Sequence, residues 1–83
     1  MKNVTVYSKD YCPYCKAAKA MLQQKGISFT EIDVLRQADK LPEMLSRSGR
    51  RTVPQIFFDD EHVGGYTDLV AYFTEVDREG NAA

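Results

Sequence analysis

The sequence predicts an α/β fold, because strand-like and helix-like patterns alternate along its 83 residues. The first part of the chain indicates strand, helix and strand, a later segment indicates a hairpin, and the last part is amphipathic at helical spacing. A chain of this length is long enough for one domain and too short for two. We therefore expect residues 1–83 to form a single domain whose functional site shares the layers that hold the fold.

The first strand is predicted over Asn3–Tyr7, where apolar and polar residues alternate. Pro13 can take a first helical position, and a helix is expected over Tyr14–Lys25 with Gly26 as its stop. Ile27–Val34 is rich in β-branched and aromatic residues and predicts a second strand. A connection of this length predicts two parallel strands joined by a right-handed crossover.

The rest of the chain predicts a short helix, a hairpin and a last helix. Asp39–Ser48 carries apolar residues at helical spacing. Gln55–Phe58 and Glu61–Val63 are short apolar runs on either side of two aspartates, the pattern of an antiparallel hairpin. Thr67 is expected to cap a last helix that continues to the neighbourhood of Glu79.

Several conspicuous side chains are expected to serve the fold and not the site. The periodicity of the aromatic residues predicts core positions for Phe29, Phe57, Phe58, Tyr72 and Phe73. His62 is expected as a strand or surface residue. Arg47, Arg50 and Arg51 are expected to form a solvated face, with guidance of an anionic or protein partner as the alternative.

The charge balance excludes several classes of partner. Eleven basic and twelve acidic residues give a net charge of −1 without a run of one sign, so neither nucleic acid nor a membrane is expected as a partner. No apolar stretch resembles a signal peptide, and none approaches the length of a membrane span. We expect a cytoplasmic protein, in a compartment where stable structural disulfides are rare.

Cys12 and Cys15, the two cysteines, are the most informative residues for function. They lie between the first strand and the first helix, which places Cys12 at a helix N-terminus. Residues three apart on a helix have Cβ atoms about 5 to 6 Å apart, so a modest adjustment lets the sulfurs form a disulfide. Closing so short a loop stabilises a fold by only about 2 kcal/mol on the chain-entropy estimate. The pair therefore predicts a redox switch.

Three spaced motifs carry a resemblance to a known family. They are Cys12-Pro13-Tyr14-Cys15 after the first strand, Thr52-Val53-Pro54 before the hairpin and Gly64-Gly65-Tyr66-Thr67-Asp68 at the start of the last helix. Together with the lead-in Ser48-Gly49-Arg50-Arg51, they make the whole chain resemble the glutaredoxins, nearest to the small bacterial dithiol proteins of the glutaredoxin 3 type. The resemblance implies a thioredoxin-like fold, in which a four-stranded mixed sheet carries two helices on one face and a third on the other.

Attack on a disulfide requires a thiolate, and a free cysteine has a pKa of about 8.5, so the nucleophile must be activated. A helix dipole typically supplies about 0.3 to 1 kcal/mol, less than a shift of one pKa unit requires. The amides of Tyr14 and Cys15 and the cation of Lys9 can supply the remainder at the Cys12 sulfur. We therefore predict Cys12 as the nucleophile and Cys15, one turn into the helix, as the buried resolving thiol.

The resemblance also implies a glutathione site around Cys12. Pro54 is expected in the cis form facing the sulfur, which leaves the Val53 backbone free to pair with an extended substrate. Asp68 is expected to bind the ammonium of the γ-glutamyl end, and amides at the start of the last helix are expected to bind its carboxylate. Lys9 is expected to attract the glycine carboxylate. The full set of expected binding residues is Lys9, Tyr14, Thr52, Val53, Pro54, Gly65, Thr67 and Asp68.

The activity that the resemblance implies is glutathione-dependent thiol–disulfide exchange on protein disulfides and glutathione mixed disulfides. It implies glutathione as the reductant and no tightly bound cofactor. Ribonucleotide reductase is a candidate protein partner, and a protein of this size is expected to be a monomer.

Three alternatives bear on the cysteine pair. Some glutaredoxins hold an iron–sulfur cluster between two chains with glutathione, although Pro13 is not usual in the motifs that bind such clusters. A donor that is reduced by a thioredoxin reductase is the second alternative, and the expected γ-glutamyl site argues against it. A structural zinc site would need four ligands, and His62 is the only further good nitrogen or sulfur donor in the chain, so no metal is expected.

Overall fold

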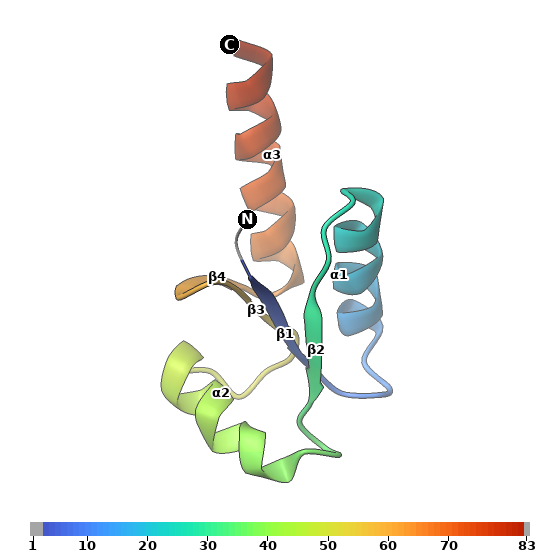
Figure 1. Ribbon diagram of the computed structural model, residues 1–83, viewed down its shortest axis with the longest axis vertical. Helices are drawn as coiled ribbons and strands as arrows, with labels where there is room; N and C mark the ends of the chain where they lie inside the picture. Colours follow the sequence, from blue (N-terminus) through green and yellow to red (C-terminus); the bar gives the residue numbers. More distant parts are fainter. Residues whose placement is uncertain (1–2, 83) are drawn as a thin grey trace.

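The computed structural model describes the backbone of residues 3–82 and the side chains of residues 3–76. In chain order the elements are β1 (Val4–Ser8), α1 (Pro13–Gln24), β2 (Thr30–Asp33), the 3₁₀ helix η1 (Ala38–Lys40), α2 (Leu41–Ser48), β3 (Gln55–Phe58), β4 (Glu61–Gly64) and α3 (Tyr66–Ala82). Figure 1 shows the strands in the middle of the molecule, with α1 and α3 on one side and α2 on the other. The predicted order of strands and helices is confirmed, and the second predicted helix begins as a 3₁₀ turn.

The four strands form one mixed sheet in the order β2-β1-β3-β4. β1 pairs with β2 in parallel, with Thr5 opposite Thr30, and α1 is the crossover between them. β3 pairs antiparallel with β1, and β4 pairs antiparallel with β3 as the predicted hairpin. Because β1 and β2 run in the same direction, the loops that follow them, including the loop with Cys12, leave the sheet at the same edge.

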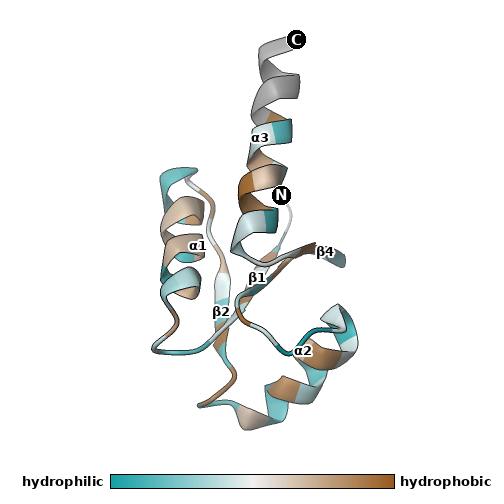
Figure 2. Ribbon diagram, turned by 180° about the vertical axis from the view of Figure 1, so that it is seen from behind, coloured by the Kyte–Doolittle hydropathy of each residue, from teal (hydrophilic) through white to brown (hydrophobic). Residues whose placement is uncertain are grey.

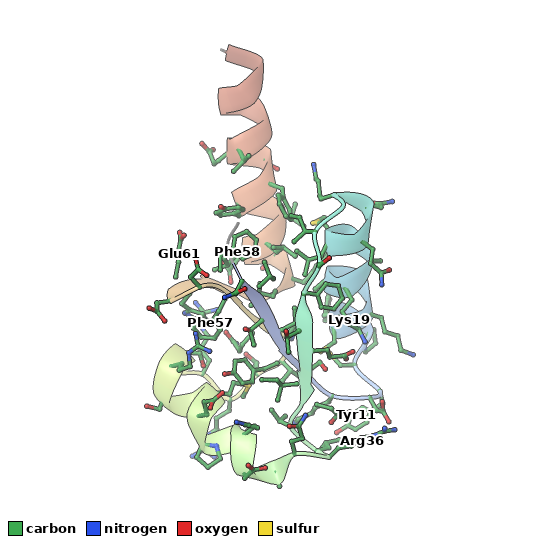
Figure 3. All side chains as sticks on the ribbon, viewed as in Figure 1. Tyr11, Lys19, Arg36, Phe57, Phe58 and Glu61 are labelled. Atoms are coloured by element: carbon green, nitrogen blue, oxygen red, sulfur yellow. The ribbon has the colours of Figure 1, made fainter. Side chains whose placement is uncertain are left out.

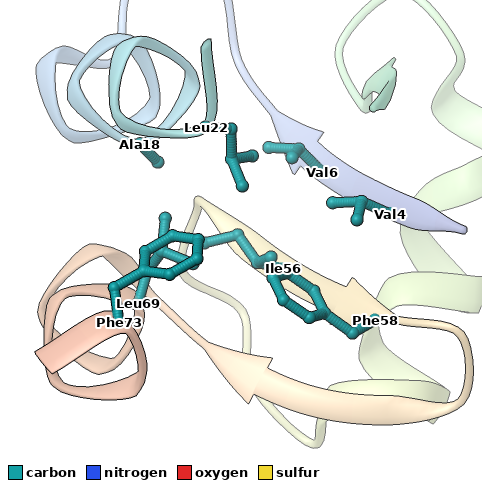
Figure 4. Packing of buried hydrophobic residues seen from close by; sticks show 8 residues of the cluster. All are labelled: Val4, Val6, Ala18, Leu22, Ile56, Phe58, Leu69 and Phe73. Atoms are coloured by element: carbon teal, nitrogen blue, oxygen red, sulfur yellow. The ribbon is translucent and has the colours of Figure 1, made fainter. Parts of the chain in front are cut away.

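Both faces of the sheet are buried beneath helices. Along β1, Val4 and Val6 face α1 and α3, whereas Tyr7 faces α2, as the alternation of a strand requires. The core on the first face consists of Val4, Val6, Ala18, Leu22, Ile56, Phe58, Leu69 and Phe73 (Figure 4). The core on the second face consists of Tyr7, Val34, Met44 and Phe57. The arrangement of two helices on one face and a third on the other is the one expected.

Hydrophobic bands alternate with hydrophilic ones along α2 and along the part of α3 next to the sheet, as amphipathic helices require (Figure 2). Of the aromatic residues predicted in the core, Phe57, Phe58 and Phe73 are buried, and Phe29 and Tyr72 are partly buried against the core of the first face. Within residues 3–82, no helix is both long enough and apolar enough to cross a membrane.

The second strand is shorter than its composition predicts, because β2 begins at Thr30 and not at Ile27. The Ile27 N–H donates to the Leu22 carbonyl at 3.0 Å, and Gly26 adopts a φ of 71°, so this segment still closes the end of α1. Ile27 and Phe29 pack against the core from the connection. Their apolar character therefore reflects core packing and not strand pairing.

Arg47 is exposed, as predicted, and its guanidinium also packs against the second face of the sheet. Its guanidinium carbon lies 4.0 Å from the centroid of the Phe57 ring, and it donates to the Tyr7 hydroxyl at 2.9 Å. Tyr7 in turn donates to the Glu43 carboxylate. Burial raises the pKa of Tyr7, and the bond to Glu43 raises it further, so the hydroxyl remains a donor. Arg47 and Glu43 thus attach α2 to the sheet below the site.

Candidate active site

Most of the predicted site residues line one open groove at the edge of the sheet where β1 ends. The groove has a volume of about 170 Å³, and its lining residues are Tyr14, Thr52, Val53, Pro54, Gly65, Tyr66 and Thr67. They come from the first turn of α1, the connection before β3 and the junction of β4 with α3. The rings of Tyr14 and Tyr66 lie 6.0 Å apart. The three sequence motifs, distant along the chain, therefore meet in space.

Cys12 is the N-cap residue of α1, as its position before Pro13 predicts. Its φ and ψ of −90° and 113° are extended, and its Sγ accepts a hydrogen bond from the Cys15 N–H at 3.2 Å. In the protonated form, Sγ also donates to the Val53 carbonyl at 3.7 Å. A backbone amide aimed at a sulfur favours the thiolate. Of the two amides expected to do this, those of Tyr14 and Cys15, the hydrogen bond comes from Cys15.

Cys15 lies behind Cys12 and is fully buried, whereas Cys12 is partly exposed. Burial, followed by a hydrogen bond with the Cys12 thiol, raises the pKa of Cys15 to about 12. Both cysteines are free thiols. The pair therefore consists of an accessible sulfur that is hydrogen-bonded to an amide and an inaccessible sulfur that holds its proton.

The connection before β3 presents its backbone to Cys12. The Val53–Pro54 peptide bond is cis, as the resemblance implies, and Pro54 is buried. Behind it, the buried Gln55 side chain donates to the Thr52 carbonyl at 2.9 Å and to its hydroxyl at 3.2 Å. His62 on β4 completes this chain of contacts, with Nε2 2.7 Å from the Gln55 Oε1. These contacts were not predicted, although a glutamine within the apolar run Gln55–Phe58 is a signal that could have indicated them.

Asp68 holds the start of α3. Its Oδ2 accepts the Gly65 N–H at 2.9 Å and a hydrogen bond from Arg50 Nη1 at 3.2 Å. The Gly65 amide, and then the Arg50 guanidinium, keep the pKa of Asp68 below its usual value. The Leu69 N–H donates to the Gly65 carbonyl, so Gly65 is the N-cap and α3 begins at Tyr66.

The prediction of Thr67 as the helix cap is therefore wrong. The side chain that binds the backbone is Asp68, three residues after the N-cap, in the position that the acidic member of a capping box takes. Thr67 lies within the first turn of α3, where backbone N–H groups have no intrahelical partner. The amides of Thr67 and Asp68 are therefore placed to bind an anion at the groove.

Comparison with known proteins agrees with this geometry. The family model for glutaredoxin matches residues 4–63. Glutaredoxin 3 of Escherichia coli (strain K12) is 55% identical over 71 residues, which cover 86% of each chain. The chain belongs to the glutaredoxin family. Its fold is similar to the solution structure of glutaredoxin from Brucella melitensis, with a TM-score of 0.78 and 45% identity over 96% of this chain and 87% of that one.

A second solved structure is the crystal structure of a buckwheat glutaredoxin–glutathione complex. It has a TM-score of 0.81 and 28% identity, and the match covers 89% of this chain and 70% of that one. The thioredoxin-like fold that the resemblance implied is thus confirmed. This glutaredoxin is a thiol–disulfide oxidoreductase that uses glutathione as its reductant.

Two ion pairs support the loop that carries Cys12. Glu31 on β2 accepts hydrogen bonds from the Ser8 hydroxyl and from Lys19, each at 2.7 Å, and these fix the end of β1 to α1. Arg36 pairs with Asp10 at 3.0 Å and joins the loops that follow β2 and β1, at the edge where Figure 3 labels Tyr11 and Arg36. Neither pair was predicted, because each joins residues that are distant in sequence.

Lys9 is half-buried and lies three residues before Cys12. Its backbone carbonyl accepts the Cys12 N–H at 3.2 Å, which fixes the turn that leads into α1. The action of the Lys9 cation on the Cys12 sulfur stays a prediction.

The groove is not the most spacious hollow that the described residues form. A hollow of about 530 Å³ lies at the opposite edge of the sheet, where β1 and β2 begin. Its lining includes Phe29, Phe58 and Tyr72, and none of the predicted site residues. Size alone would therefore select the wrong end of the molecule, whereas the cysteines and the motif residues identify the groove.

The difference between the two thiols predicts selective alkylation. Excess iodoacetamide at pH 7.5 should label Cys12 in the native reduced protein and should label Cys15 at least about 100-fold more slowly, because a buried thiol that keeps its proton does not react. Peptide mass spectrometry measures the two sites separately. After unfolding in guanidinium chloride both cysteines should be labelled. Equal labelling of the two sites in the native protein would contradict the assignment.

Proposed function

We propose that Cys12 is the nucleophile of this glutaredoxin, that Cys15 is its resolving thiol, and that glutathione binds in the groove beside them. The observation that carries the proposal is the position of the Cys12 sulfur. It accepts the Cys15 amide at 3.2 Å and lies against the backbone of Val53, a residue that lines the groove. An incoming sulfur can therefore approach Cys12 from the groove, while Cys15 stays behind it.

With a glutathione mixed disulfide, the Cys12 thiolate attacks the glutathione sulfur, and the substrate leaves as a thiolate that takes up a proton. A second glutathione, as its thiolate, then attacks the glutathione sulfur of the Cys12–glutathione disulfide, which forms glutathione disulfide and releases the Cys12 thiolate. Cys15 takes no part in this cycle. In total, one free glutathione and the mixed disulfide are converted to the substrate thiol and glutathione disulfide, so one disulfide bond replaces another.

With a protein disulfide, the Cys12 thiolate forms a mixed disulfide with the substrate and releases the first substrate thiolate. Cys15 then attacks the Cys12 sulfur, and the departing second substrate thiolate takes up the proton that Cys15 loses. This transfer is required because burial raises the pKa of Cys15 to about 12, so free thiolate is scarce before the reaction. Two glutathiones return the Cys12–Cys15 disulfide to the dithiol form.

In this proposal glutathione is held by groups in the groove and by Lys9 and Asp68, which lie outside its lining. The Val53 backbone pairs with its cysteinyl part, and the Tyr14 ring flanks the sulfur. Asp68 binds the γ-glutamyl ammonium, and the amides of Thr67 and Asp68 bind the adjacent carboxylate. Lys9 attracts the glycine carboxylate. The proposed binding residues are those predicted, namely Lys9, Tyr14, Thr52, Val53, Pro54, Gly65, Thr67 and Asp68. The buckwheat relative solved as a glutathione complex supports this proposal.

The proposal also covers the biological setting. The substrates are glutathionylated proteins and protein disulfides, with ribonucleotide reductase as a candidate. We propose that residues 1–83 act as a single glutaredoxin domain, as a monomer in the cytoplasm and without a tightly bound cofactor. A coupled assay with glutathione, glutathione reductase and a small mixed disulfide tests the activity and the reductant together. Turnover that required a thioredoxin reductase would overturn the assignment of the reductant.

Removing the Asp68 carboxylate tests recognition of the γ-glutamyl end. Asp68→Ala should raise the KM for glutathionylated substrates by about 10-fold, the size expected for loss of a charged hydrogen bond. The KM for a mixed disulfide without a γ-glutamyl group should change little, because that substrate has no ammonium for Asp68. Asp60→Ala, which removes a carboxylate from the exposed hairpin turn, is the charge-matched control. Equal effects of Asp68→Ala on both substrates would remove the recognition argument.

A further inference from the structure

Arg50 lies directly against Asp68, whose carboxylate binds the ammonium of glutathione in the proposed function. Its Nη1 is 3.2 Å from the Asp68 Oδ2, and the two side chains are 50% and 45% exposed. The same Oδ2 accepts the Gly65 N–H at 2.9 Å. An ammonium that approaches Asp68 therefore meets a carboxylate that already has one cation beside it.

The backbone holds Arg50 in this place. Ser48 Oγ accepts the Arg50 N–H at 3.0 Å and donates to the Met44 carbonyl at 2.7 Å, which attaches the residue to the last turn of α2. Gly49, with a φ of 71°, turns the chain between the helix and Arg50. The guanidinium is thus presented to the start of α3 by a defined turn and not by a free loop.

Because of this position, the effect of Arg50 on binding depends on which chemical group lies beside the ammonium of the ligand. A ligand with an ammonium alone brings a second cation to Asp68, and the two like charges oppose each other. A ligand with a carboxylate on the same carbon as the ammonium offers Arg50 an anion. A guanidinium has five N–H donors in a planar fork, so it can contact Asp68 and a ligand carboxylate at the same time.

We propose that Arg50 is a specificity-determining residue that makes this site require a free α-carboxylate beside the α-ammonium. In this arrangement Asp68 binds the ammonium, whereas Arg50 and the first-turn amides of α3 bind the carboxylate. The inference rests on the proposed function, because it extends the γ-glutamyl site. Arg50 is exposed, as predicted, and the proposal gives this exposed residue a role at the site.

Two ligands that cannot react with thiols test the proposal. The first is S-methylglutathione, and the second is the same compound with the α-carboxyl group of its glutamyl residue converted to the amide. Their dissociation constants are measured by isothermal titration calorimetry at pH 7 for the wild-type chain, Arg50→Gln, Arg50→Lys and Lys40→Gln. Lys40→Gln removes one positive charge from the other end of α2 and is the matched control.

In the wild-type chain the free acid should bind more tightly than the amide. Arg50→Gln should reduce that preference by about 10-fold, mainly by weakening the free acid, as expected for loss of a charge-assisted hydrogen bond. Arg50→Lys should give an intermediate preference, because it keeps the charge and loses the fork. Lys40→Gln should leave the preference unchanged.

The outcomes separate this inference from the function on which it rests. If Arg50→Gln weakens both ligands equally, Arg50 only orients Asp68 or the fold, and the inference is overturned while the glutathione site stands. An unchanged preference in Arg50→Gln overturns it as well. If the wild-type chain binds neither ligand, the proposed glutathione site fails, and the role of Arg50 fails with it.

Discussion

Replacing Cys12 by serine is expected to abolish both reactions, with a loss of at least about 1,000-fold, in line with loss of the nucleophile in other enzymes. A serine hydroxyl does not ionise near neutral pH, so the Cys15 amide 3.2 Å from that position has no thiolate to stabilise. Cys15 cannot substitute for Cys12, because it is fully buried and its pKa is raised to about 12. The measurement is turnover in the coupled glutathione assay, with a glutathione mixed disulfide and with a protein disulfide as substrates.

Cys15→Ser is the matched control for this variant, since it removes the other sulfur of the same pair. It should retain reduction of the glutathione mixed disulfide, a cycle in which Cys15 takes no part. Reduction of the protein disulfide should fall sharply, because the mixed disulfide with the substrate can no longer be resolved within the protein. Activity of Cys12→Ser on either substrate at the level of the wild-type chain would show that the roles of the two sulfurs are assigned wrongly.

The fold was predictable where a pattern is local. The crossover from β1 to β2 and the hairpin of β3 and β4 follow from periodicity and turn residues, which act within a few positions. The start of β2 was not predictable in this way. Ile27 and Phe29 are of residue types common in strands, yet they pack on the core from the connection before β2. Only the tertiary structure decides whether such residues pair in a strand or pack from a loop.

In the site, too, features set by local sequence were predictable, and features set by tertiary packing were not. The cap position of Cys12 follows from its place before Pro13, whereas the cis form of Pro54 was implied only by resemblance to the family. The contact of Arg50 with Asp68 joins residues 18 positions apart, and no local pattern indicates it. Side-chain pairing across elements depends on the final packing, so the sequence could name Asp68 but not the cation beside it.

Gly64→Ala is expected to damage both stability and glutathione recognition. Gly64 has a φ of 120°, a region that residues with a side chain rarely adopt, and such strain costs about 1–3 kcal/mol. A Cβ at this position would also lie 2.7 Å from the Cγ and 2.8 Å from the Cβ of Asp68. The Asp68 side chain would have to move, and its bond to the Gly65 N–H at the start of α3 would break. The variant should lower the Tm and raise the KM for glutathionylated substrates by about 10-fold, as expected for loss of the charged contact at Asp68.

Gly26→Ala separates the two causes. Gly26, at the end of α1 and away from the groove, also has a positive φ, of 71°, but a Cβ there has no neighbour within 4 Å, so this variant has backbone strain without displacement of a side chain. It should lower the Tm and leave the KM unchanged. The KM effects of Gly64→Ala and Asp68→Ala should not add in the double variant, because both remove the same contact with the ammonium. A fully additive double variant, or a rise in KM in Gly26→Ala as large as that in Gly64→Ala, would show that Gly64 does not act through the position of Asp68.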